Sequence, residues 1–192
     1  MIKVLAVAAA ILLGFWSQTA QAAPITYLGT LQSGVPVSDS VPNGGPDNPD
    51  TADYWQFTLT ENALVTITGH RLESGLDPAF YLFRGTFADT DEFGGSLGSG
   101  PIAELEFADD DIPALPGLAG PFSDPREIIQ LPAGTYTIAF SDYLSSGPGP
   151  WRYCLELNGP ADSCDQRVPM PATLLLLGLG VIGSAAFRYG RF

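Results

Sequence analysis

Basic residues, histidine and cysteine are all scarce in this chain of 192 residues. It has 8 Lys and Arg residues against 21 Asp and Glu residues, with one histidine and two cysteines. Nucleic-acid partners favour clustered Lys and Arg, so the net charge of −13 argues against nucleic-acid binding. So few imidazole and thiol groups argue against a His- or Cys-rich zinc site. The composition therefore disfavours much enzyme chemistry, and we predict a protein that is not an enzyme.

The N-terminal segment has the three parts of a secretory signal peptide. Lys3 supplies the positive charge, residues 4–16 are apolar, and Ala20-Gln21-Ala22 has the small-x-small pattern of a cleavage site. The apolar run is too short for a lasting membrane span. We predict a signal peptide over residues 1–22.

The C-terminal segment combines an uncharged run with a basic end. Residues 172–187 carry no charge, and Arg188 and Arg191 follow them. A helix over these residues would be roughly 24 Å long at about 1.5 Å per residue. The positive-inside rule places the two arginines in the cytoplasm. We predict a transmembrane helix over residues 172–187.

The same segment resembles the PEP-CTERM sorting signal of bacteria that make exopolysaccharide. The resemblance rests on the apolar run, the basic end and a proline motif, in which Met170 stands where the usual signal has Glu. The motif residues are Val168, Pro169, Met170 and Pro171. The resemblance implies a sorting tail over residues 167–192 and processing by an exosortase-like membrane protease. It also implies an inner-membrane anchor before sorting, then the surface or extracellular matrix of a Gram-negative bacterium.

The segment between the two ends, residues 23–166, is strongly acidic. All 21 acidic residues lie there against four arginines, a net charge of −17. A chain of this size buries roughly 68% of its surface on folding, which is enough for one sound core. Such charge keeps the domain soluble and repels other polyanions.

Alternating apolar and polar residues predict an all-β domain. Trp55, Phe57 and Leu59 share one face of a strand, and Leu105 and Phe107 share a face of another. The same alternation gives three further strands an apolar face, made of Val65 and Ile67, of Tyr136, Ile138 and Phe140, and of Tyr153, Leu155 and Leu157. About eight short strands separated by turn signals are typical of a β-sandwich. The expected strands are 25–32, 54–60, 64–68, 78–84, 102–107, 127–131, 135–141 and 152–158. Because Gly and Pro are abundant, the stretches 33–51, 94–101 and 112–125 are predicted to be long loops.

The core also resembles the bacterial pre-peptidase C-terminal domain and its surface-protein relatives. The matching segments are Asp53–Phe57, Leu76–Leu82, Asp109–Asp111 and Leu131–Ile138. The resemblance spans about residues 53–158 and implies a jelly-roll-like antiparallel β-sandwich. It also implies an accessory role, such as binding or tethering, in place of catalysis.

Two cysteines on the exported side of a membrane favour a disulfide. Cys154 lies on the outward face of the last expected strand, and Cys164 follows a turn-like Asn-Gly-Pro sequence. A bridge would close a loop of about eleven residues, worth about 2.8 kcal/mol in the chain-entropy model. Two free thiols are the alternative.

Four other features have a structural interpretation beside a functional one. Gly94–Gly98 matches G-x-S-x-G, but its flanks and the single histidine favour a loop over a nucleophile elbow. Gly178–Gly183 matches G-x-G-x-x-G, and its apolar setting favours close helix packing. We expect His70 to be a surface or hydrogen-bonded residue and Trp55 a core residue. Trp151, in a Gly/Pro-rich loop, is the better candidate for an exposed ring that stacks on sugars.

Acidic clusters at turns predict a Ca²⁺ site, since Ca²⁺ takes six to eight oxygen ligands, chiefly carboxylates and carbonyls. Adjacent carboxylates repel one another, and a cation would relieve that cost. The alternative is a solvated acidic edge that prevents strand-to-strand aggregation. The candidate ligands are Asp47, Asn48, Asp50, Asp53, Asp77, Asp109, Asp110 and Asp111.

Three functional hypotheses remain at this point. The first is a non-enzymatic envelope or matrix protein that binds or structures exopolysaccharide. The second is a Ca²⁺-stabilised accessory module that binds a surface or other partner protein. The third, which we favour least, is a glycoside hydrolase that uses two carboxylates about 5 to 9.5 Å apart.

Overall fold

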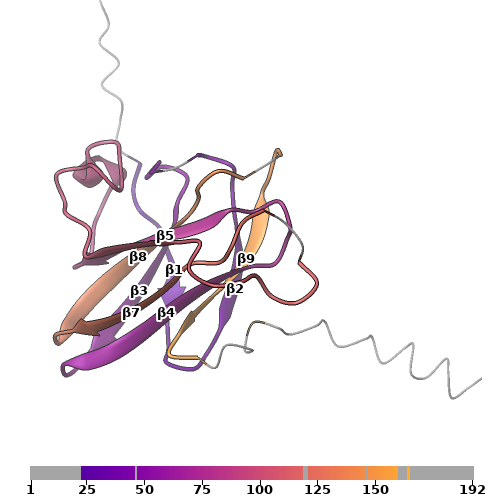
Figure 1. Cartoon of the computed structure of the whole chain (residues 1–192). Helices are drawn as coiled ribbons and strands as arrows, with labels where there is room; N and C mark the ends of the chain where they lie inside the picture. The colour runs from indigo at the N-terminus through magenta and orange to yellow at the C-terminus, as the bar shows by residue number, and fades with distance from the viewer. Residues whose placement is uncertain (1–22, 46, 119–120, 146, 160–163, 165–192) are drawn as a thin grey trace, which may run out of the picture.

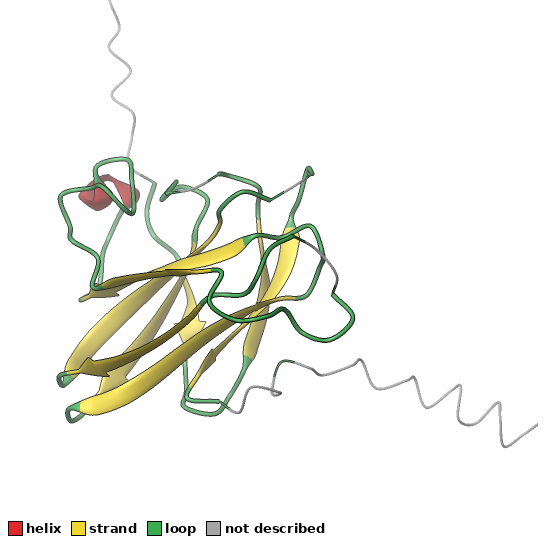
Figure 2. Ribbon diagram, viewed as in Figure 1, coloured by secondary structure: helices red, strands yellow, loops and turns green. Residues whose placement is uncertain are grey.

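The computed structural model describes residues 23–45, 47–118, 121–145, 147–159 and 164, which form a β-sandwich of two sheets (Figures 1 and 2). The five-stranded sheet has the order β1 (Tyr27–Thr30), β3 (Asp53–Leu59), β8 (Gly134–Asp142), β5 (Pro78–Arg84), β6 (Glu106–Asp109). The four-stranded sheet has the order β2 (Val37–Val41), β9 (Trp151–Leu157), β4 (Ala63–Arg71), β7 (Arg126–Leu131). The predicted jelly-roll-like β-sandwich is confirmed.

The strands pair antiparallel except at one edge. β1 runs parallel to β3, with Tyr27 opposite Tyr54, whereas every other pairing between named strands of the described chain is antiparallel. Pro132 and Ala133 join β7 to β8, and each of these strands lies in a different sheet. The short turn therefore passes the chain from one layer of the sandwich to the other.

The predicted inward faces form the core between the sheets. Trp55 and Phe57 of β3 are buried there, and Leu59 packs against them. The phase of the alternation is likewise as predicted in β4, β8 and β9. The residues that these three strands contribute are Val65, Ile67, Tyr136, Ile138, Phe140, Tyr153, Leu155 and Leu157. Apolar surface removed from water on these faces is the main force that holds the layers together.

A second apolar cluster covers the outer face of the five-stranded sheet. Tyr81 and Phe83 of β5 project away from the core between the sheets and pack with Phe93 and Leu97. Phe93 ends a short 3-10 helix, η1 (Thr90–Phe93), in the connection from β5 to β6. β5 is consequently buried on both faces, and the β5–β6 connection folds back over the sheet to cover it.

One strand lies within a stretch predicted to be a loop, so that prediction is wrong for part of residues 33–51. β2 occupies Val37–Val41 and pairs antiparallel with β9, with Val41 opposite Trp151. Its sequence has only two apolar residues, separated by Ser-Asp-Ser. Pairing with β9 stabilises this strand, and a sequence window of five residues carries no signal of that partner.

The prediction for residues 102–107 is wrong in both position and phase. The strand there is β6, Glu106–Asp109, and its inward residue is Ala108. Leu105 and Phe107 are 40% and 38% exposed, and the Phe107 ring lies 4.7 Å from the Tyr81 ring on the outer face. β6 is the edge strand of its sheet, and its one large apolar residue, Phe107, contacts the outer cluster in place of the core.

The predicted signal peptide, the sorting motif and the predicted membrane helix 172–187 lie outside the described residues. Within the described part of the chain, no helix has the length and hydropathy needed to span a membrane.

Matched truncations on β4 test its register. Ile67 is fully buried and Leu64, on the opposite face, is 63% exposed. We expect Ile67→Ala to lower the free energy of unfolding by about 2 to 5 kcal/mol, because it leaves a cavity. Leu64→Ala should change it by no more than about 0.5 kcal/mol. Chemical denaturation of both variants measures the difference, and equal losses would contradict the register.

Candidate functional site

Three carboxylates predicted as calcium ligands converge at one end of the five-stranded sheet. Asp77 immediately precedes β5, Asp109 ends β6, and Asp110 follows it. β5 and β6 are antiparallel neighbours with Ala79 opposite Asp109, which brings the start of one strand beside the end of the other. One oxygen from each of the three carboxylates lies within 4.8 Å of the other two. We call Asp77, Asp109 and Asp110 the carboxylate cluster.

The backbone holds Asp77 firmly while its carboxylate is left partly unpaired. The Asp77 N–H donates to Ser145 Oγ at 2.7 Å, and the Asp77 carbonyl accepts from the Tyr143 N–H at 2.8 Å. Asp77 is only 3% exposed, yet its Oδ1 and the Oδ1 of Asp109 make no hydrogen bond to any described residue. A buried polar atom without a partner is costly, so these two oxygens are suited to receive a ligand.

A fourth carboxylate, Asp142, lies beside the cluster and was missed by the sequence analysis. It ends β8 and is paired with Pro78, the residue after Asp77. Its Oδ1 accepts from the Ser145 N–H at 2.9 Å, whereas its buried Oδ2 has no hydrogen-bond partner among the described residues. The order of strands within the sheet is what brings Asp142 here, and the sequence signal was only an acid at the end of a predicted strand.

Burial and mutual repulsion raise the pKa values of the cluster. Burial is the largest cause of the rise in the pKa of Asp77 to about 7, followed by the charges of Asp109, Asp110 and Asp142. Burial also raises the pKa of Asp109 to about 6, with the charges of Asp110 and Asp111 adding to it. Both carboxylates therefore resist ionisation in the absence of a cation, and a bound cation would reverse that preference.

The side chains of Asp110 and Asp111 accept hydrogen bonds from backbone N–H groups between β6 and the start of β7. Asp110 Oδ1 accepts from the Ser123 N–H at 2.6 Å, and Asp111 Oδ2 accepts from the Arg126 N–H at 3.0 Å. Asp110 has a positive φ of 50°, which turns the chain away from β6. Asp110 is exposed and belongs to the cluster, whereas Asp111 accepts from the start of β7 and lies outside the cluster.

The residues predicted from the loop 47–53 do not join the carboxylate cluster. Asp47 Oδ1 accepts from the Tyr81 hydroxyl, and Asp50 Oδ1 accepts from the Thr90 hydroxyl at 2.6 Å. Asn48 Oδ1 accepts from the Asp50 N–H at 3.0 Å, as in an Asx turn. These contacts fasten the loop to the outer face of the five-stranded sheet. Calcium binding by these residues stays a prediction, since they do not belong to the carboxylate cluster.

Asp53 belongs to a hydrogen-bonded chain that crosses between the sheets. The Trp55 Nε1–H donates to the Tyr153 hydroxyl at 2.8 Å, and that hydroxyl donates to Asp53 Oδ2 at 2.8 Å. Burial is the main cause that raises the pKa of Asp53 to about 6, and the bond from Tyr153 opposes it. Trp55 is buried as predicted, and its polar edge is satisfied.

The cysteine and tryptophan predictions have opposite outcomes. Cys154 and Cys164 form the predicted disulfide, with their Cα atoms 5.9 Å apart. Trp151 is not an exposed loop residue, because pairing with β2 extends β9 back to include it and its ring packs against the core. Its proposed role as a sugar-stacking ring is therefore not supported.

His70 is hydrogen-bonded, which is one of the two settings predicted for it, and it is deeply buried and not at the surface. His70 is 2% exposed, and its Nδ1 lies 3.0 Å from Asp124 Oδ2.

Ser96 of the G-x-S-x-G match follows η1 in a turn, and its hydroxyl accepts from Ser99. That arrangement agrees with the predicted loop. The Gly178–Gly183 match lies outside the described residues.

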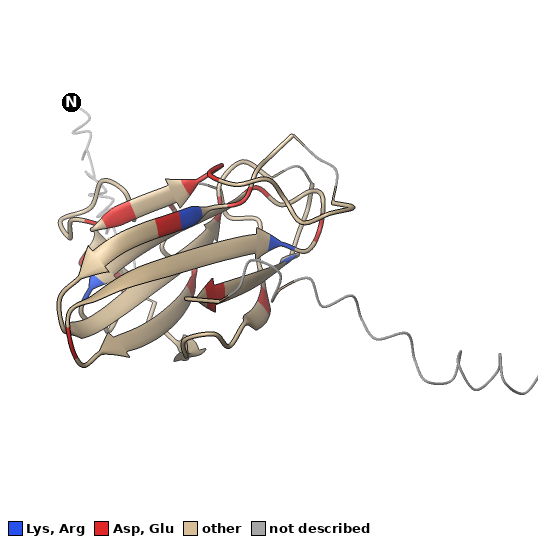
Figure 3. Cartoon of the chain, turned by 60° about the horizontal axis from the view of Figure 1, so that its bottom comes forward, with Lys and Arg blue, Asp and Glu red and all other residues tan. Residues whose placement is uncertain are grey.

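A polar hollow lies on the four-stranded sheet, away from the carboxylate cluster. Its volume is about 270 Å³, and Ser38, Asp39, Ser40 and Arg152 line it. Figure 3 shows how the acidic residues (red) are distributed over the sandwich and how few arginines (blue) oppose them. Arg152 is thus one of the few positive charges of residues 23–166 and lies beside Asp39 of β2.

Residues 167–191 match the family described as the PEP-CTERM protein-sorting motif. The predicted sorting tail is confirmed, and the chain is an exported protein with a membrane-anchored sorting signal. No curated protein matches the chain.

Three solved structures are similar to the chain at low sequence identity. The pre-peptidase C-terminal domain of a collagenase from Bacillus anthracis is 11% identical with a TM-score of 0.44, over 70% of this chain and 99% of that one. CorA, a surface-associated copper-binding protein of Methylomicrobium album BG8, is 14% identical with a TM-score of 0.42, over 70% and 98%. The K3 cleaved adhesin domain of Lys-gingipain from Porphyromonas gingivalis is 19% identical with a TM-score of 0.30, over 63% and 70%.

The raised pKa of Asp77 predicts how stability depends on pH without a cation. Because the folded-state pKa of about 7 exceeds the ordinary aspartate pKa of 3.8, the folded chain holds a proton that the unfolded chain releases. In chelator, Asp77 should make the chain less stable as pH rises from about 4 to about 7. Asp77→Asn should flatten this slope and exceed the wild type in stability at about pH 8.

Denaturation of the full chain in detergent at several pH values measures the slope. Asp91→Asn is the matched control, since Asp91 is exposed on η1. An Asp77→Asn profile that follows the wild type throughout would contradict the electrostatic account of the cluster.

Proposed function

We propose that the chain is a non-enzymatic, exported β-sandwich module that binds Ca²⁺ at the carboxylate cluster and structures exopolysaccharide through the bound cation. One observation carries the proposal. Asp77 is 3% exposed and presents a carboxylate oxygen without a hydrogen-bond partner in the described chain, beside Asp109 and Asp110. A cation among these carboxylates would supply the missing partner and offset their repulsion.

The donor set suits Ca²⁺ better than a softer metal. All three side chains offer only oxygen, and hard cations prefer oxygen ligands. Asp109 and Asp110 lie where β6 ends and the chain turns, so backbone carbonyls and waters can complete a coordination shell of six to eight oxygens. Extracellular modules bind Ca²⁺ at about 10⁻⁴ to 10⁻³ M, which suits an exported protein.

Electrostatics supports a bridging role for the cation. With 21 acids against four arginines in residues 23–166, the domain repels acidic polymers. A Ca²⁺ ion held by three carboxylates keeps coordination positions for sugar hydroxyl or carboxylate oxygens. Asp110 is exposed, so the cluster opens toward solvent on one side. Binding of an acidic polysaccharide would then require the cation.

The carboxylate spacing favours cation binding over glycoside hydrolysis. A glycosidase needs an acid and a partner carboxylate about 5 to 9.5 Å apart, with the sugar between them. The oxygens of the carboxylate cluster lie within 4.8 Å of one another, and three acids share the site. A Ca²⁺-stabilised module that binds a partner protein in place of polysaccharide is the second candidate, because the same cluster serves it.

Cosedimentation of the full chain in detergent with matrix polysaccharide tests the proposal. We expect binding in about 2 mM Ca²⁺, a loss in chelator, and little binding in Mg²⁺ at equal ionic strength. Asp77→Asn and Asp109→Asn should each weaken Ca²⁺-dependent binding at least about tenfold, while Asp91→Asn binds as the wild type does.

Each outcome separates the candidates. A rise in melting temperature with Ca²⁺ and no polysaccharide binding would favour the partner-protein module. Polysaccharide binding that is unchanged in chelator would contradict the bridging role. Release of reducing sugars that is lost in Asp109→Asn would contradict the non-enzymatic assignment.

We also propose that an exosortase-like protease removes the tail and delivers the module to the surface or matrix of a Gram-negative cell. The motif has Met170 where the usual signal has Glu. Intact-mass measurement should find a mature chain that starts near Ala23 and ends near Pro171, and Met170→Glu should raise the fraction that is cut. A released chain that still ends at Phe192 would contradict tail removal.

A further inference from the structure

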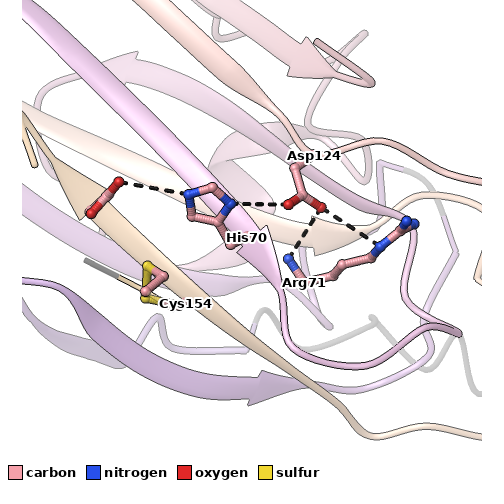
Figure 4. Close-up of a disulfide and its surroundings, with 6 residues drawn as sticks. His70, Arg71, Asp124 and Cys154 are labelled. Atoms are coloured by element: carbon pink, nitrogen blue, oxygen red, sulfur yellow. Dashed lines mark hydrogen bonds and ion pairs between the residues drawn. A yellow bond between two sulfur atoms is a disulfide. The ribbon is translucent and has the colours of Figure 1, made fainter. Parts of the chain in front are cut away.

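The fold brings together the only histidine and the only two cysteines of the chain. His70 of β4 is directly opposite Cys154 of β9, and Cys154 is bonded to Cys164. Glu156, two residues along β9, lies on the same face as Cys154, because Tyr153, Leu155 and Leu157 point to the core. Figure 4 shows the His70 ring beside the disulfide on this outer face of the four-stranded sheet.

The four side chains form a buried cluster with the chemistry of a soft-metal site. His70, Cys154 and Glu156 are each no more than 2% exposed, and Cys164 is 7% exposed. One ligand atom from each of His70, Glu156 and Cys164 lies within 4.8 Å of the other two. His70 Nε2 makes no hydrogen bond to a described residue, and Glu156 Oε1 lies 3.7 Å from it. The free nitrogen of the imidazole is thus directed at the sulfur and carboxylate groups.

Asp124 fixes the orientation of His70 in the manner of a metal-site partner. Its Oδ2 lies 3.0 Å from His70 Nδ1, and its Oδ1 accepts from the Arg71 N–H at 3.3 Å (Figure 4). Asp124 is fully buried. Metal-binding histidines almost always donate their second ring N–H to a carboxylate or carbonyl, which sets the tautomer and raises the basicity of the ligating nitrogen. Here that arrangement leaves Nε2 as the ligating atom.

We propose that the chain with both thiols reduced binds one Zn²⁺ through Cys154, Cys164, His70 Nε2 and Glu156, and that disulfide formation closes this site. Zn²⁺ is tetrahedral with S, N and O ligands at about 2.0 to 2.3 Å, so its ligand atoms are about 3.3 to 3.8 Å apart. The ligand atoms of His70, Glu156 and Cys164 lie within 4.8 Å of one another and need only a small inward movement, whereas the two sulfurs must move apart once the disulfide is reduced. The scarcity of Cys and His in the sequence argued against a zinc site. The fold nevertheless places the one histidine and the two cysteines next to one another.

The two states compete for the same thiols. Before the disulfide forms, Cys154 and Cys164 are thiols. Zn²⁺ binding releases their two protons and leaves two thiolates on the metal. Oxidation instead removes two electrons and two protons from the thiols, which a disulfide-exchanging oxidant accepts as its own disulfide becomes two thiols. The site therefore reports whether the exported chain meets zinc or an oxidant first.

Metal uptake by the full chain in detergent tests the site. The chain is reduced with dithiothreitol, freed of it without air, and titrated with Zn²⁺, with Co²⁺ as the spectroscopic probe. We expect one Zn²⁺ per reduced chain, none on the oxidised chain, and thiolate-to-cobalt absorption in the near ultraviolet. His70→Gln and Glu156→Gln should each weaken Zn²⁺ binding more than about 100-fold, beyond the usual effect of losing an outer-shell partner.

Asp91→Asn is the matched control, since Asp91 is exposed on η1 and its loss should leave zinc binding to the reduced chain unchanged. Far-ultraviolet circular dichroism and formation of the disulfide in air show that each variant is folded. Equal zinc uptake by oxidised and reduced chains would overturn the proposal, as would wild-type affinity in both His70→Gln and Glu156→Gln. A reduced chain that takes up no zinc, folded or unfolded, would also overturn it.

Discussion

The burial of β5 on both faces is the constraint on which the rest of the architecture depends. Phe80 and Leu82 face the core, while Tyr81 and Phe83 face the outer cluster, so the strand must be covered from two sides. The β5–β6 connection therefore folds back over the sheet, and β6 returns as an edge strand beside β5. This arrangement buries Asp77 at the start of β5 and places Asp109 and Asp110 next to it.

Acidic side chains converge at one end of the five-stranded sheet, where Asp77 and Asp142 are buried. Acidic side chains end or precede the three neighbouring strands β5, β6 and β8, and the resulting repulsion and burial raise the pKa values of Asp77 and Asp109. Two other acids have local partners: Asp124 lies against His70 and Arg71, and Asp53 accepts from Tyr153. The carboxylate cluster has no such cationic partner among the described residues, which is why a bound cation gives the simplest explanation of its chemistry.

Features that depend on a short stretch of sequence could be predicted from the sequence alone. Alternation located the inward faces of β3, β4, β8 and β9, and compartment chemistry predicted the Cys154–Cys164 bridge. β2 was missed because its pairing with β9 is non-local, and Trp151 was then misassigned to a loop. Sequence proximity grouped Asp109, Asp110 and Asp111, whereas the sheet order selects Asp77 and Asp142 as neighbours and excludes Asp111. No sequence pattern predicts the grouping of His70 with Asp124, Cys154 and Cys164. These residues meet only through the pairing of β4 with β9 and through the loop before β7.

The most direct measurement of the central claim is a crystal structure of the chain grown with Ca²⁺, with anomalous scattering used to locate the ion. The account predicts one Ca²⁺ bound by Asp77, Asp109 and Asp110, at about 2.3 to 2.6 Å from their oxygens, with waters completing the shell. It also predicts that the ion is absent from crystals of Asp77→Asn grown in the same solution. Carboxylates that share protons through short hydrogen bonds at saturating Ca²⁺, with no ion between them, would contradict it.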